Sequence, residues 1–199
     1  MPAEKRNRRF QANIWISSGE THQINEHRRH IAIKFDLHCL IVDALRRERD
    51  DDLTRWGCST LAALCKATDT QSGRISAHVR RQAVADAGGL DMLIRVIANQ
   101  NKILAKQKGC KALASLCQAD CDLGPEVLQA TEARRRLAAD RGALEALAGF
   151  LRGPITITIK GVAMATLNQI VWKNDERKQE APRAGTDKRC FLFFGNDGF

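Results

Sequence analysis

Histidine and cysteine are concentrated near the N-terminus, where they raise the question of a metal site. Positions 22 to 39 contain His22, His27, His30, His38 and Cys39. His27 and His30 are three residues apart and would share one face of a helix. Structural zinc sites use closely spaced ligand pairs, however, and the chain has no Cys-x-x-Cys pair. We therefore predict no metal site.

Arginine recurs in pairs along the chain, a second pattern with chemical potential. The pairs are Arg28-Arg29, Arg80-Arg81 and Arg134-Arg135. A row of guanidinium groups binds phosphates or carboxylates, so a partner-binding basic stripe is one interpretation. The other interpretation is a solvated helix face that keeps the protein soluble. No aromatic residues are interleaved with the pairs, which disfavours single-stranded nucleic acid, because its bases need stacking surfaces.

Motifs for enzyme chemistry are absent from the sequence. There is no phosphate-binding glycine loop, no Gly-x-Ser-x-Gly turn and no recurring pair of carboxylates. We therefore predict no catalytic residue and no cofactor.

The elements that must position these arginines are revealed by an internal repeat. The pattern Gly-Cys-x-x-Leu-Ala-x-Leu-Cys occupies residues 57–65 and returns 52 positions later at residues 109–117. A looser copy at residues 160–167 matches 108–116 with one residue deleted. A fixed period of this size is typical of stacked supersecondary units.

Each unit reads as three helices. In the middle unit a first helix runs to Ala87, Gly88-Gly89 interrupts it, and Leu90, Leu93 and Ile97 mark an amphipathic second helix. The third helix carries the repeated Leu and Cys pattern. In the first unit, Phe35-Asp36 stands in place of the glycine pair. We predict an all-α, right-handed α-solenoid with units at about 26–67, 76–118 and 125–173.

The glycine turn followed by the Gly-Cys-x-[Ala/Thr]-Leu-Ala-x-Leu helix resembles the armadillo repeat, over roughly residues 26–173. The resemblance implies that a partner binds along a concave face made by the third helices. The positions it assigns to this groove are Ser59, Ala63, Lys111, Ser115, Val162 and Thr166. Importin-type repeats carry Trp and Asn at these positions, and that ladder is missing here. We therefore expect no binding of nuclear-import signals.

Composition limits which partners and which cell compartment we expect. The net charge is +9 with a pI of about 9.5, which favours acidic partners. Aromatic content is 5% and there is no Tyr, as suits helix packing better than sheets. Seven cysteines without a disulfide framework suggest buried thiols in a reducing compartment, the cytosol or the nucleus. No apolar run is long enough to span a bilayer.

The two ends differ in character from the repeats. Residues 1–25 read as a basic, poorly ordered lead. Residues 174–199 read as a charged linker, broken by Pro182 and Gly185, that ends in the apolar segment 190–194. The sequence does not define an oligomeric state.

These observations predict a non-catalytic scaffold that binds an acidic protein or peptide along the groove. Two alternatives stay open. One is a nucleic-acid-binding helical-repeat protein that uses the arginine stripe, and the other is a peripheral membrane adaptor held by the same stripe.

Overall fold

The chain is all-α, as the sequence predicts. The computed structural model describes residues 22–47, 50–99 and 101–183, and these residues form ten α-helices and one 3-10 helix with no β-strand. The predicted lead up to residue 21 and the apolar segment 190–194 lie outside the described residues. The first helix begins at His22, four residues before the predicted start of the first unit.

The helices follow one another in sets of three. The first set is α2 (His22–Lys34), α3 (Leu37–Arg47) and α4 (Asp51–Cys65). The second is α5 (Gln71–Asp86), α6 (Gly89–Asn99) and α7 (Ile103–Cys117). The 3-10 helix η1 (Cys121–Leu123) leads into the third set, α8 (Pro125–Asp140), α9 (Ala143–Arg152) and α10 (Ile157–Val171), and α11 (Asp175–Arg183) follows.

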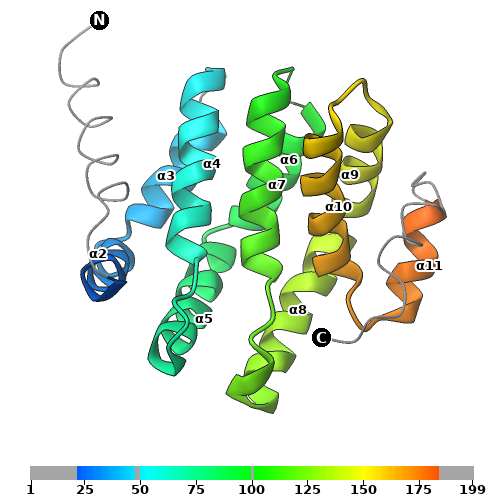
Figure 1. Ribbon diagram of the computed structural model, residues 1–199. Helices are drawn as coiled ribbons and strands as arrows, with labels where there is room; N and C mark the ends of the chain where they lie inside the picture. The colour runs from blue at the N-terminus through cyan, green and yellow to red at the C-terminus, as the bar shows by residue number, and fades with distance from the viewer. Residues whose placement is uncertain (1–21, 48–49, 100, 184–199) are drawn as a thin grey trace, which may run out of the picture.

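Equivalent helices of successive sets lie side by side (Figure 1). The third helices α4, α7 and α10 form one layer, with α7 packed between its two neighbours. The second helices pack behind them, α6 against both α3 and α9. The first helices α5 and α8 run along the lower edge in Figure 1, where each third helix ends. Every set therefore shares its apolar surface with the next one.

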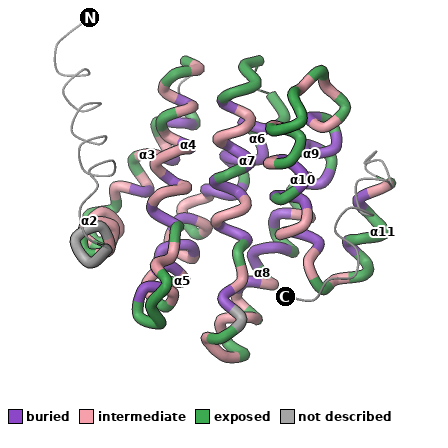
Figure 2. Tube along the Cα trace, viewed as in Figure 1, coloured by how far each residue is buried: buried purple, intermediate pink, exposed green. Residues whose placement is uncertain are grey.

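The core is continuous from one set to the next and lies between the two layers (Figure 2). Leu61, Leu113 and Leu167, at corresponding places on the third helices, are fully buried. Helices of 10 to 16 residues are marginal in isolation, so their stability comes from this shared packing. Burial of one such Leu contributes about 1.5–3 kcal/mol.

A left-handed residue joins each first helix to the second. Gly88 and Gly142 have φ of 82° and 86°, which glycine adopts without steric cost. Asp36 holds the same place in the first set, with φ of 52°. Aspartate is among the few other residues that tolerate this conformation, which explains how the turn survives where the glycine is missing.

The third set stands 54 residues after the second, which corrects the predicted alignment. α8, α9 and α10 match α5, α6 and α7 at this spacing, while α3 and α4 precede α6 and α7 by 52. The two extra residues lie in the connection from α7 to α8, which holds η1. The apparent copy at residues 160–167 was therefore aligned out of register, because short Gly-Ala-Leu runs match at more than one offset.

The C-terminal segment is not simply a linker. Asp175–Arg183 forms α11, which packs on α9 and α10 and buries Arg177 and Ala181. The prediction of a linker from residue 174 is therefore wrong for residues 175–183. Their high charge concealed a helix whose contact surface consists of only a few residues.

Candidate functional site

The arginine pairs of α5 and α8 lie at the junctions between successive sets. Arg80 Nε donates to Leu64 O at 2.6 Å, and Arg81 Nε donates to Cys65 O at 3.0 Å. These two carbonyls belong to the last residues of α4. The last carbonyls of a helix have no partner within the helix and carry partial negative charge, so a guanidinium is well suited to bind them.

The same arrangement recurs one junction further along. Arg134 Nε donates to Leu116 O at 3.1 Å, and Arg135 Nε donates to Cys117 O at 2.9 Å. Leu116 and Cys117 are the last residues of α7. Each first helix therefore caps the third helix of the preceding set.

Further partners compensate the buried guanidinium groups. Arg80 forms an ion pair with Glu26 of α2, and Arg81 forms one with the buried Asp120. Arg134 Nη1 donates to Gln82 Oε1 at 2.9 Å. Arg135 lies over the Trp172 ring, with 4.7 Å between its Cζ and the ring centroid. A charge this deeply buried needs such pairing, because its desolvation costs several kcal/mol.

The predicted surface stripe is therefore wrong for four of its six arginines. Arg80, Arg81, Arg134 and Arg135 are at most 2% exposed. Burial lowers the pKa of Arg80 and Arg134, which is the expected penalty on the charged form.

The first pair differs from the other two. Arg28 and Arg29 are half-buried on α2, and Arg29 Nη1 donates to Glu26 at 3.2 Å and to Lys66 O at 3.3 Å. Arg29 thus also contacts the end of α4, on which Arg80 converges. None of the three pairs forms an open basic row, so neither interpretation of the stripe holds.

A hollow of about 410 Å³ lies on the face of the third-helix layer. α4, α7 and α10 supply its walls, and alanine is the commonest lining residue. Its lining residues are Ala62, Ala63, Lys66, Lys111, Ala114, Ser115, Val162, Ala165 and Thr166. Small side chains on three adjacent helices allow another backbone to approach this surface closely.

Most of the predicted groove positions line this hollow. Ala63, Lys111, Ser115, Val162 and Thr166 are brought together there, whereas Ser59 is not among the lining residues. Ala62, Lys66, Ala114 and Ala165 were missed, although each lies within one helical turn of a predicted position.

Thr166 was assigned to the groove because of the incorrect alignment of α10. At the spacing of 54 it corresponds to the buried Ala112, and it is itself fully buried. Its hydroxyl lies 2.8 Å from Val162 O and 3.0 Å from Cys110 O of α7. Ala165 and Gln169 are the true counterparts of Lys111 and Ser115. Thr166 therefore joins α10 to α7; although it lines the hollow, its hydroxyl is already bonded within the protein.

The polar groups at the hollow differ in what they offer. Ser115 Oγ donates to Lys111 O at 3.0 Å, so its proton is used within the helix. Lys66 and Lys111 are exposed and form no ion pair with any described residue. Lys108 of α7, one turn before Lys111, adds a third cation near these two. Recognition here would rest on shape and positive charge.

Asp36, His38 and Cys39 bring three ligand-type atoms within 4.8 Å of one another. His38 Nε2 lies 3.4 Å from Cys39 Sγ, a distance that a hydrogen bond between them explains. Burial lowers the pKa of His38 and favours its neutral ring. The three positions are almost consecutive and Asp36 is exposed, so the cluster does not resemble a closed structural zinc site.

The cysteines of the repeated pattern are buried free thiols. Cys58, Cys65, Cys110 and Cys117 all lie in the core. Burial raises the pKa of Cys58, Cys65 and Cys110 to about 12 and that of Cys117 to about 11. The thiols therefore stay protonated and unreactive near neutral pH.

Among the described residues, no helix has the length and apolar character required to cross a membrane. No known protein-family model matches the chain, and comparison with curated proteins gives no match. The chain is similar to a crystal structure of an engineered protein, a Northeast Structural Genomics Consortium target, with a TM-score of 0.59 and 18% identity. The match covers 90% of this chain and 68% of that chain. At this identity the likeness concerns the fold alone.

Proposed function

We propose that the chain is a short armadillo-like α-solenoid that acts as a non-catalytic scaffold. Its binding surface is the face of α4, α7 and α10, and its partner is an acidic segment of another protein. The observation that carries this proposal is the hollow of about 410 Å³, where small side chains of three helices adjoin Lys66 and Lys111.

The solenoid arrangement is supported by how the sets contact one another. Each third helix packs on the next third helix, and each second helix packs on the next second helix. The arginine pairs join consecutive sets in the same way at two junctions. Contacts between neighbours only are the hallmark of solenoids, whose extended faces commonly bind partners.

The charge on this face supports an acidic partner. Lys66 and Lys111 are exposed and Lys108 is half-buried, and none of them forms an ion pair with a described residue; the exposed Asp69 follows Lys66 by three residues. An approaching carboxylate therefore meets net positive charge, which raises the rate of association. Five described free cysteines are consistent with the cytosol or the nucleus as its compartment.

Nucleic acid is not favoured as a partner. That alternative depended on the arginine stripe, and four of the six arginines are buried in contacts within the protein. A buried guanidinium bonded to carbonyls cannot neutralise a phosphate.

Selection from a random peptide library tests the proposal. Peptides enriched on the immobilised protein should be acidic and should bind Lys111→Glu at least tenfold more weakly than wild type. Ala114→Trp should have a similar effect, because the indole fills the hollow. Lys178→Glu on α11 is the matched control and should bind as wild type does.

Two results would overturn the proposal. One is enrichment of peptides without net negative charge. The other is equal affinity for wild type, Lys111→Glu and Ala114→Trp, which would place the binding surface elsewhere.

A further inference from the structure

A second exposed surface lies at the edge where the second helices end and the third helices begin. The connections from α6 to α7 and from α9 to α10 meet at this edge, at the top of Figure 1. α7 and α10 pack against each other, and both begin at this edge. This edge is separate from the hollow, whose lining includes none of its residues.

Large apolar side chains project from this edge. Ile157, the first residue of α10, is 87% exposed, while Ile103 and Leu104 at the start of α7 are 39% and 52% exposed. Ile103 and Ile157 hold equivalent places in consecutive sets. Exposed aliphatic groups at neighbouring loop ends are unfavourable in water and indicate a surface that contacts something apolar.

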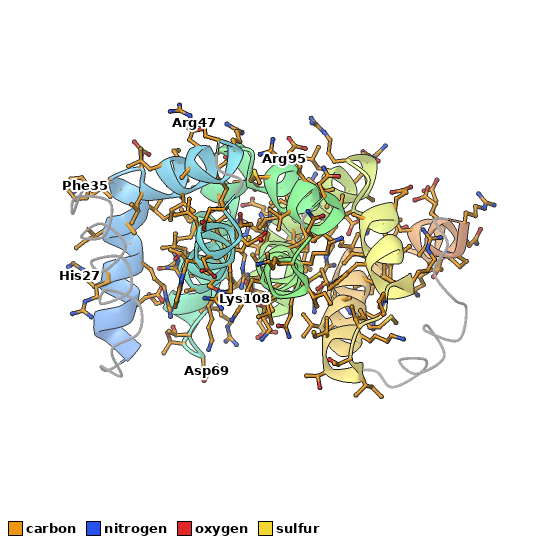
Figure 3. The ribbon with its side chains drawn as sticks, turned by 90° about the horizontal axis from the view of Figure 1, so that it is seen from above. His27, Phe35, Arg47, Asp69, Arg95 and Lys108 are labelled. Carbon is orange, nitrogen blue, oxygen red and sulfur yellow. The ribbon has the colours of Figure 1, made fainter. Side chains whose placement is uncertain are left out.

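Basic residues accompany these apolar groups in the sequence, and the same two segments contain no acidic residue. Residues 101–108 and 149–161 contain Lys102, Lys106, Lys108, Arg152 and Lys160, and no Asp or Glu. Arg152 and Lys160 are exposed, five residues before and three residues after Ile157 in the sequence. Arg95, labelled in Figure 3, donates from Nη2 to Leu45 O at 3.2 Å and to Arg46 O at 3.0 Å, at the end of α3.

The first set differs at the same place. Asp50, Asp51 and Asp52 stand where α4 begins, and Asp51 Oδ2 lies 3.4 Å from Lys102 Nζ. An anionic surface would therefore be repelled by the first set and attracted by the second and third. The basic and apolar character is specific to the ends of α7 and α10.

We propose that this edge binds an anionic lipid bilayer, with Leu104 and Ile157 inserted among the lipid tails near the headgroups and Arg152 and Lys160 against the phosphates. Projecting aliphatic residues within a cationic rim match the apolar and charged layers of a membrane surface. The proposal stands independently of the proposed function, since Leu104, Arg152, Ile157 and Lys160 do not line the hollow.

Vesicle flotation at 0.1 M salt tests this inference. Wild type should float with vesicles of phosphatidylcholine and phosphatidylserine and should remain unbound with phosphatidylcholine alone. Arg152→Glu/Lys160→Glu should reduce the partition coefficient at least tenfold, because each basic residue near such a surface contributes about a fivefold gain. Leu104→Ser/Ile157→Ser should reduce it about fivefold or more.

Matched controls separate this edge from general basicity. Lys34→Glu/Lys178→Glu removes equal charge elsewhere, and Ile75→Ser/Val79→Ser removes two exposed apolar groups from α5. Both controls should stay within about threefold of wild type, and circular dichroism verifies that each variant is folded. Brominated lipid tails should also quench the fluorescence of the Ile157→Trp variant. Soluble phosphoserine cannot mimic this effect, because it has no tails.

Three results would overturn the inference. They are no flotation of wild type with anionic vesicles, control variants that lose as much binding as the edge variants, and an Ile157→Trp fluorescence that brominated lipids leave unchanged.

Discussion

Arginine and lysine serve different regions of this molecule. Arg80, Arg81 and their counterparts on α8 are buried and bind carbonyls at the ends of third helices. Lys66 and Lys111 are exposed on the face of the third-helix layer. Each of these side chains adds one positive charge to the net charge of +9, but these arginines are buried at the junctions and these lysines are exposed.

The chemistry of the two side chains explains this division. A guanidinium has several donors in a fixed plane and is only weakly hydrated, so it can satisfy several acceptors inside a protein. An ammonium is strongly hydrated and stays at the surface on its flexible stem. Net charge alone therefore says little about which cations are available to a partner.

The largest effect should come from breaking a buried pair. Arg81→Met leaves Asp120 charged and unpaired and removes the donors to Cys65 O and Gln118 O. We expect a loss of about 3–5 kcal/mol in the free energy of unfolding, measured by urea denaturation. The double variant Arg81→Met/Asp120→Leu should lose less than the two single variants combined, and strict additivity would contradict the pairing.

A core leucine provides an uncharged comparison at the same junction. Leu116→Ala removes a fully buried side chain and leaves the Leu116 backbone carbonyl, which accepts from Arg134 Nε, in place. The expected loss is about 2–5 kcal/mol, in the same urea experiment. A change below about 0.5 kcal/mol would place Leu116 at the surface and contradict the packing.

The buried thiols should make stability depend on pH in the alkaline range. Their native pKa values of about 12 for Cys65 and about 11 for Cys117 lie above the ordinary value of 9.0. The unfolded chain therefore loses these protons first, so the free energy of unfolding falls as pH rises from about 9 to about 11. Each thiol should contribute a loss of about 1.4 kcal/mol by pH 10.

Urea denaturation at pH 8 and pH 10 measures this dependence. Between pH 8 and pH 10, the free energy of unfolding of Cys65→Ala/Cys117→Ala should fall by about 3 kcal/mol less than that of wild type. An identical loss in both proteins would mean that the thiols are not buried.

Two Gly→Ala substitutions should change the stability by smaller amounts and in opposite directions. Gly88→Ala places a Cβ at a φ of 82° and against the Arg46 guanidinium, so we expect a loss of about 1–2 kcal/mol. Gly161→Ala has open space at an exposed position of α10 and should gain about 0.5–1 kcal/mol. Thermal melts of both variants check the difference, and equal shifts would contradict the turn.

The smallest effect on stability should come from the exposed lysines. Lys111→Met should change the free energy of unfolding by less than about 0.5 kcal/mol, because it breaks no ion pair with a described residue. A loss comparable to that of Arg81→Met would remove the distinction between the two kinds of cation.

Periodicity was sufficient to predict the three-helix units and their glycine turns. The buried Leu and Cys pattern repeats at helical spacing, and Gly88 and Gly142 stand where the turns require them. Five of the six predicted positions line the hollow, because the third helices lie side by side; the two on α10 do so although they were aligned out of register.

The burial of the arginines could not be predicted from general preferences, since charged residues are rarely buried unless paired. A signal was nevertheless present. Arg134 follows Arg80 by 54 residues, as Gly142 follows Gly88. This shared spacing indicates the correct alignment of the third set, in which residues 160–167 need no deletion. Charge that repeats in register with the core is evidence of a structural role.

The exchange of arginine Nε protons, followed by nuclear magnetic resonance in deuterated water, tests the central claim most directly. The Nε protons of Arg80, Arg81, Arg134 and Arg135 are buried in hydrogen bonds to helix-terminal carbonyls, so they should persist far longer than that of the exposed Arg152. Exchange of all five at the same fast rate would show that these arginines are open to solvent and that the junctions are held in another way.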